Sequence, residues 1–79
     1  MVEMKEWREV ILSVVDEQLK QDNPREARLT LRRLMGNGNT EEEAKEKIAV
    51  VLIEEVYDVV KSGTPYNEKR YVSRLKQLK

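Results

Sequence analysis

Two carboxylates one helical turn apart are the first residues in this sequence that could do chemistry. Glu54 and Asp58 stand four residues apart in an otherwise apolar stretch, with Glu55 off their shared helical face. Such a pair can bind a hard cation or share a proton in acid–base catalysis. Helical di-iron sites also need a Glu-x-x-His pattern, and the sequence contains no His. Because Lys61 follows Asp58 by three residues, we interpret the pair as part of a solvated, salt-bridged stripe and keep a carboxylate metal site as a minor alternative.

The glycine-rich loop at residues 36–39, sequence GNGN, is a second candidate because a predicted helix follows it directly. Phosphate cradles use the backbone amides of such loops together with the positive N-terminus of a helix. Here three glutamates, residues 41–43, would fill the first turn and repel a phosphate. The spacing also matches neither the dinucleotide-binding nor the P-loop pattern. We therefore predict a corner between two helices, in which Gly36 or Gly38 takes a left-handed conformation.

Nucleophilic catalysis has no recognisable constellation in this chain. Neither Cys nor His is present, so the usual nucleophile–base pairs cannot form around Ser13, Ser62 or Ser73. The absence of Cys and His also removes the usual ligands of a zinc site. We predict a protein that is not an enzyme and that holds no metal and no cofactor.

The basic side chains form a candidate interaction surface. Fifteen basic and fifteen acidic residues cancel, but residues 41–60 carry two basic and seven acidic groups, whereas residues 61–79 carry six and one. If the second and fourth predicted helices are neighbours, seven cations can share one face. These residues are Arg25, Arg28, Arg32, Arg33, Lys69, Arg70 and Arg74.

Two uses of these cations are open. Together with Lys76 and Lys79 they could bind the phosphates of nucleic acid, which the zero net charge makes the weaker alternative. The preferred interpretation is that they meet the acidic third helix, either within the molecule or across a dimer.

Four predicted helices position these residues, because apolar side chains recur in each segment at three- and four-residue spacing. Capping residues support the boundaries: Asn23 before a proline, Thr40 in a Thr-x-x-Glu capping box, and Asn67 before the last segment. The predicted helices cover residues 3–21, 24–35, 41–62 and 68–78. The sequence thus predicts an all-α fold, a compact bundle of four helices in a single domain over residues 1–79.

The third predicted helix carries apolar residues over well over half of its circumference, more than one neighbouring helix can bury. It is therefore either central to the bundle or shared with a second subunit. We predict a homodimer that uses this helix together with the apolar excess of the first helix. The candidate self-association residues are Val50, Ile53, Val56, Tyr57 and Val60. On the first helix, Trp7 stands at helical spacing with Ile11 and Val14, and we place it in the core.

The length of the chain bears on its stability, and its hydropathy bears on its location. A chain of 79 residues has a small core, which rarely supplies more than roughly 3 to 5 kcal/mol of net stability, so self-association could supplement it. The longest apolar run, Ile48–Ile53, is far shorter than a membrane span. No basic leader followed by an apolar stretch marks a signal peptide, so we predict a cytoplasmic protein that does not enter membranes.

Two resemblances add expectations. The stretch RRLMGNGNTEEEAKEKI resembles the Met-Gly loop of ubiquitin-associated three-helix domains, although Asn37 stands where those domains have an aromatic residue. From Trp7 onward the chain resembles a group of short bacterial all-helical proteins of unknown function. The matching positions are Glu17, Gln18, Leu19, Asn23, Pro24, Leu34, Glu43, Ala44, Pro65, Tyr66, Asn67, Glu68 and Tyr71. This resemblance implies a bacterial all-α protein, and no role of the His residues that such relatives carry can apply to a chain without His.

The sequence therefore does not name an activity. It predicts a non-enzymatic structural or protein–protein interaction domain that self-associates through apolar helix surfaces and has an unidentified protein partner. A small nucleic-acid-binding module is the alternative.

Overall fold

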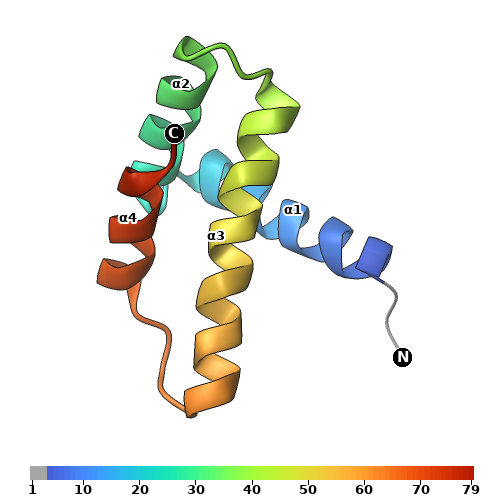
Figure 1. Cartoon of the computed structure of the whole chain (residues 1–79), viewed down its shortest axis with the longest axis vertical. Coiled ribbons are helices and arrows are strands. Elements are labelled where there is room, and N and C mark those ends of the chain that lie inside the picture. The colour runs from blue at the N-terminus through green and yellow to red at the C-terminus, as the bar shows by residue number, and fades with distance from the viewer. Residues whose placement is uncertain (1–3) are drawn as a thin grey trace.

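The fold is all-α, as predicted (Figure 1). A computed structural model describes the backbone of residues 4–79 and the side chains of residues 6–79. Within the described backbone there are four helices and no strand: α1 (Met4–Gln21), α2 (Arg25–Gly36), α3 (Glu41–Ser62) and α4 (Glu68–Gln77). The predicted ranges differ from these by at most one residue at each end, and the predicted first residue, Glu3, lies outside the described residues.

The longest helix, α3, is the element against which the others pack. In Figure 1, α2 and α4 lie along one side of α3, and α1 crosses it steeply near its middle. The N-terminal half of α1 projects beyond α3 on the side away from α4 (Figure 1). The lower half of α3 extends well past this crossing, so α1 covers only part of the face that it meets.

The core lies where the four helices meet and contains apolar side chains from each of them. On α1, Ile11, Val15 and Leu19 recur every four residues and so form one buried stripe. Tyr71 is fully buried, and its hydroxyl donates a hydrogen bond to Gln18 Oε1 at 2.8 Å. The buried apolar residues are Ile11, Val15, Leu19, Ala27, Leu34, Ala44, Ile48, Ala49, Val51, Leu52, Tyr71 and Leu75.

Two of the three predicted N-caps are confirmed. The Thr40 hydroxyl accepts a hydrogen bond from the Glu43 amide at 3.1 Å, and Glu43 Oε1 accepts one from the Thr40 amide at 2.8 Å, which completes the capping box. The Asn67 side chain accepts a hydrogen bond from the Arg70 amide at 3.1 Å and caps α4.

The prediction that Asn23 caps α2 is wrong. Pro24 is the N-cap residue and makes no side-chain capping bond. Asn23 instead ends α1: Asp22 has a φ of 57°, and the Asn23 amide donates to the Gln18 carbonyl at 3.0 Å, the pairing of a Schellman motif. Asp22 and Asn23 therefore complete the preceding helix, and neither side chain caps the next one.

Among the described residues, no helix is both long enough and apolar enough to cross a membrane.

The glycines at the ends of α2 and α3 allow a matched test of backbone conformation. Gly63 ends α3 with a φ of 67°, Gly36 is the last residue of α2, and neither has an atom within 4 Å of an added Cβ. We expect Gly63→Ala to lower the free energy of unfolding by about 1 kcal/mol, because its conformation is left-handed. Gly36→Ala should leave stability unchanged or raise it by up to about 1 kcal/mol. Urea unfolding measures both, and equal effects would contradict this assignment.

Candidate functional site

The residues first considered for chemistry do not form a common site in the structure. Glu54 is exposed, whereas Asp58 is paired with Arg74, with 2.6 Å between Oδ2 and Nη2. Lys61, expected to pair with Asp58, lies instead over the Tyr57 ring at 5.8 Å from its centroid. The described residues contain no group of three or more Asp, Glu, His or Cys side chains placed to hold a metal ion.

The glycine-rich loop is a corner, and its helix terminus is already occupied. Gly38 has a φ of 102°, which satisfies the predicted need for a positive φ in this loop. Hydrogen bonds from the Thr40 backbone amide, and then from its side chain, lower the pKa of the Glu43 carboxyl below its ordinary value. A carboxylate therefore takes the position at the start of α3 that a phosphate would need.

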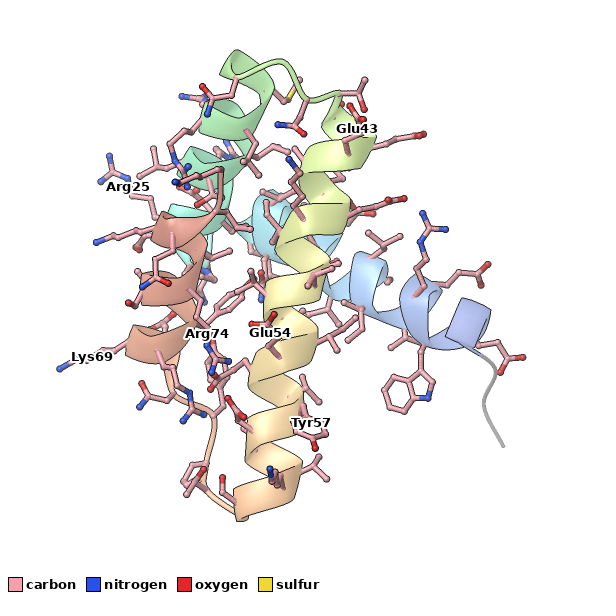
Figure 2. All side chains as sticks on the ribbon, in the orientation of Figure 1. Arg25, Glu43, Glu54, Tyr57, Lys69 and Arg74 are labelled. Atoms are coloured by element: carbon pink, nitrogen blue, oxygen red, sulfur yellow. The ribbon has the colours of Figure 1, made fainter. Side chains whose placement is uncertain are left out.

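The strongest electrostatic feature is an ion-pair cluster in which the partly exposed side chains of Arg70, Arg74 and Asp58 surround the buried Glu55. The Glu55 side chain is fully buried, and Arg70 donates to its two oxygens from Nε and Nη2, each at 2.7 Å. The Asn67 amide donates a further bond to Glu55 Oε1 at 3.1 Å. In Figure 2, Arg74 points from α4 towards α3. The cluster therefore fastens the first two turns of α4 to the C-terminal half of α3.

Arg74 also belongs to the cluster, but it lies farther from Glu55 than Arg70 does. Its Nη1 atom is buried, has no hydrogen-bond partner among the described residues, and lies 3.6 Å from Glu55 Oε2. Its Nη2 atom reaches Asp58. Chiefly because Arg70 hydrogen-bonds the carboxylate, the pKa of Glu55 is lowered below its ordinary 4.5, although burial acts in the opposite direction.

Glu55 was missed as a functional residue at the sequence level, where it was placed apart from the charged stripe. A signal was available, because residue 55 falls at helical spacing with Ile48, Leu52 and Val59 on the buried face of α3. A carboxylate on that face requires a cationic partner, and the sequence contains fifteen cations without indicating which of them is close.

The seven predicted surface cations separate into three groups. Arg70 and Arg74 meet the acidic third helix, as the preferred interpretation held. Two others bind the ends of helices: Arg28 donates to the Leu19 carbonyl near the end of α1, and Arg33 Nη2 donates to the Leu75 carbonyl of α4 at 2.9 Å. Arg33 Nη1 also contacts the Leu78 carbonyl. These cations supply donors that helix C-termini lack and complement the helix dipole.

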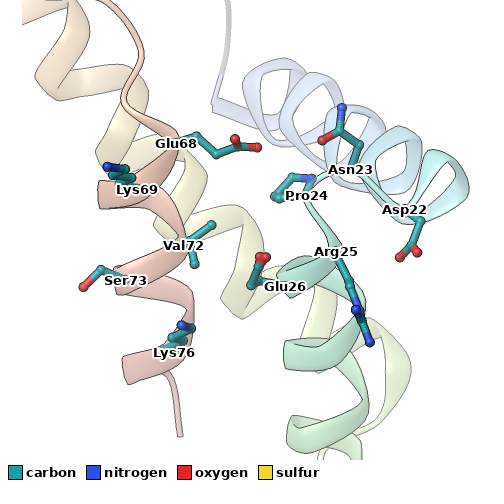
Figure 3. Close-up of a pocket in the computed structure, with 10 residues that line it drawn as sticks. All are labelled: Asp22, Asn23, Pro24, Arg25, Glu26, Glu68, Lys69, Val72, Ser73 and Lys76. Carbon is teal, nitrogen blue, oxygen red and sulfur yellow. The ribbon is translucent and has the colours of Figure 1, made fainter.

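The remaining three, Arg25, Arg32 and Lys69, make no ion pair with another described side chain. Arg25 and Lys69 line a groove of about 640 Å³ between the start of α2 and α4. In Figure 3 both side chains point outward, and Glu26 and Glu68 point into the gap. Carboxylates inside the groove disfavour phosphate binding there.

The buried phenol, Tyr71, is not placed for proton transfer. Burial raises its pKa above the ordinary 10, and its hydroxyl already donates to Gln18. It is therefore neutral at physiological pH and serves as a packing residue that links α4 to α1.

The most extensive unpaired feature is an apolar surface on α1 and α3. Among residues 6–79, eleven large apolar side chains are exposed, and eight of them lie on these two helices. We call the α1 members, Trp7, Val10 and Val14, the α1 stripe, and the α3 members, Val50, Ile53, Val56, Tyr57 and Val60, the α3 stripe. Together they form the α1–α3 apolar surface. The α3 stripe consists of the residues predicted from the sequence to mediate self-association, and its members are 38% to 77% exposed.

Trp7 corrects a sequence-based expectation. It was placed in the core with Ile11 and Val14, but Trp7 is 52% exposed and Val14 is 41% exposed, while Ile11 is buried. The helical spacing of these residues is right, but α1 projects beyond α3, so the first turns of its apolar face have no helix beneath them (Figure 1).

A groove marks the place where the two stripes meet. It has a volume of about 590 Å³ and lies between α1 and α3, with Trp7, Ile11, Ala49, Val50 and Ile53 as its apolar walls. Arg8 and Glu46, which pair with each other across the two helices, stand at its rim. The lining is apolar with a charged edge, the composition typical of the centre of a protein–protein contact.

Comparisons with protein-family models, with curated proteins and with solved structures found no match. The two resemblances drawn from the sequence therefore stay predictions, and the candidate function rests on the physical features described above.

The ion-pair cluster predicts that substitutions at the adjacent residues Glu55 and Glu54 change the free energy of unfolding by different amounts. Glu55→Gln removes the charge that two arginines and the Asn67 amide surround, and we expect it to lower the free energy of unfolding by about 2 kcal/mol. Glu54→Gln, the exposed neighbour, should change it by less than about 0.5 kcal/mol. Urea unfolding at pH 7 measures both. Similar losses in the two variants would show that the cluster is not what fixes α4.

The same cluster predicts a pH dependence. Because the pKa of Glu55 is lowered in the folded protein, its stabilising contribution is complete above the unfolded-chain value near 4.5 and is lost as pH falls through the lower folded value. The stability difference between the wild-type protein and Glu55→Gln should therefore be constant from neutral pH down to about pH 5 and shrink below it. Unfolding curves from pH 7 to pH 3 test this, and a difference that grows on acidification would contradict it.

Proposed function

We propose that this protein is a small non-enzymatic interaction domain that self-associates through the α1–α3 apolar surface. The observation that carries the proposal is the concentration of exposed apolar side chains on two adjoining helices. Val60 is 77% exposed, Tyr57 61% and Val10 54%; such values are ordinary for single residues, but here eight of the eleven exposed large apolar side chains among residues 6–79 lie on two helices.

The size of this surface supports a stable contact. The exposed fractions of its eight side chains add up, over both helices, to on the order of 700 Å². A standard stable interface buries roughly 800 Å² on each partner. Trp7 and Tyr57 supply the aromatic anchors that dominate such contacts.

The chain itself is a suitable partner for this surface. A helical domain of this size has a small core, and self-association is one of the few means of adding buried apolar area to a chain without Cys. The basic and acidic residues balance, so no strong net charge keeps two copies apart.

Nucleic-acid binding receives less support. Of the nine cations considered for it, Arg28, Arg33, Arg70 and Arg74 have hydrogen-bond or ion-pair partners within the described part of the chain, and the groove beside Arg25 and Lys69 contains two carboxylates. A cation that already pairs with a carboxylate or a helix end has less charge left to attract a phosphate.

A matched pair of charge substitutions tests the proposal. Ile53 and Leu29 are almost equally exposed, at 44% and 48%, but only Ile53 belongs to the α1–α3 apolar surface. We expect the wild-type protein and Leu29→Glu to dimerise with the same Kd in sedimentation equilibrium. Ile53→Glu should weaken the dimer at least tenfold, because it places a charge at the centre of the contact. A wild-type protein that stays monomeric at all concentrations, or equal effects of the two substitutions, would contradict the proposal.

A further inference from the structure

We infer that two copies associate by two-fold symmetry, with the α1 stripe of each copy packed on the α3 stripe of the other. This inference rests on the proposed function and specifies its interface. In a two-fold contact each surface serves both partners, so two unlike stripes on one chain can satisfy each other twice.

The geometry of the chain favours this exchange. The two stripes lie on helices that cross steeply, and the N-terminal half of α1 and the lower half of α3 bound an open angle (Figure 1). Figure 2 places Tyr57 on the side of α3 from which α1 projects, so the α3 stripe faces this angle. A helix from a second copy that enters the angle contacts the α3 stripe and the groove beside Trp7 together.

A two-fold dimer could place α3 on α3, α1 on α1, or α1 on α3, and these three contacts differ in whether they cover both stripes. If α3 packed on the α3 of the second copy, the α1 stripe, including the half-exposed Trp7, would stay in water. If α1 packed on α1, the more exposed residues Tyr57 and Val60 would stay in water. Mutual packing of α1 on α3 removes both sets from solvent, and the gain in buried area favours it.

The charges at the edges of the stripes agree with this choice. Glu6, Glu9 and Glu17 line a shallow groove on α1 together with Val10 and Val14. None of these glutamates makes an ion pair among the described side chains. An α1–α1 contact would bring the two acidic edges together.

The α3 stripe is bordered by charges of both signs, because the exposed residues Glu54 and Lys61 both lie beside it. Lys61 borders the α3 stripe over the Tyr57 ring, and it too makes no ion pair with a described side chain. In the exchanged arrangement the acidic edge of α1 can meet Lys61 of the second copy, a rim contact of the kind that sets orientation more than affinity.

Cysteine cross-linking tests which helices meet. The chain has no Cys, so Val10→Cys and Val14→Cys on α1, and Val56→Cys and Val60→Cys on α3, each introduce a single thiol. Two variants, one carrying a tag that changes its mass, are mixed, diluted and reconcentrated so that subunits exchange. A short bismaleimide then links thiols that lie close together. Leu29→Cys, equally exposed but outside the surface, is the control.

We expect α1 thiols to link to α3 thiols several times more efficiently than either kind links to itself, and the control to link to neither. Equal or greater linkage between two α3 thiols, or between two α1 thiols, overturns the exchanged arrangement and leaves self-association standing. A dimer in sedimentation that gives no link in any combination also overturns the arrangement. A chain that stays monomeric overturns the proposed function itself, so the two failures are distinguishable.

Discussion

The structure depends on one geometric constraint, the length of α3 relative to the helices that cover it. Its 22 residues extend about 33 Å, close to the 35 Å of the longest dimension of the molecule. The ten residues of α4 reach about half as far, and α1 crosses α3 instead of running along it (Figure 1). Part of α3 therefore stays uncovered on the α1 side, and the sequence places Ile53, Val56 and Val60 there rather than charged residues.

The two sides of α3 are specified by different kinds of interaction. Towards α4, Glu55 and Asp58 bind Arg70 and Arg74 through short, directional bonds that fix how far α4 lies along α3. The cost of desolvating a buried carboxylate offsets much of its attraction to the arginines, but removing one partner leaves a buried charge unpaired. Towards α1, the apolar core contacts are flanked by two ion pairs between partly exposed side chains, Arg8 with Glu46 and Lys45 with Asp16, and such pairs contribute little to stability. The first side closes the fold of the chain, and the second leaves apolar side chains of α3 exposed.

The parts of this structure that were predictable from sequence are those governed by local interactions. Helix boundaries followed from spacing and caps to within one residue, as at the start of α3 beside Thr40 and Glu43. Asn23 was misassigned because a polar residue between two helices can end one or begin the other. Trp7 was misplaced because its spacing identifies the apolar face of α1 but not how far α3 extends beneath it. The pairing of Glu55 with Arg70 joins residues 15 apart, which no local pattern reveals.

Trp7 offers the most direct measurement of the central claim, that a second copy covers the α1–α3 apolar surface. It is the only tryptophan in the chain and belongs to that surface, so its fluorescence reports on the contact without labelling. In a dilution series followed also by light scattering, the account predicts short-wavelength emission in the dimer and a red shift in step with dissociation. Long-wavelength emission that stays constant at all concentrations, including those at which a dimer is present, would contradict it.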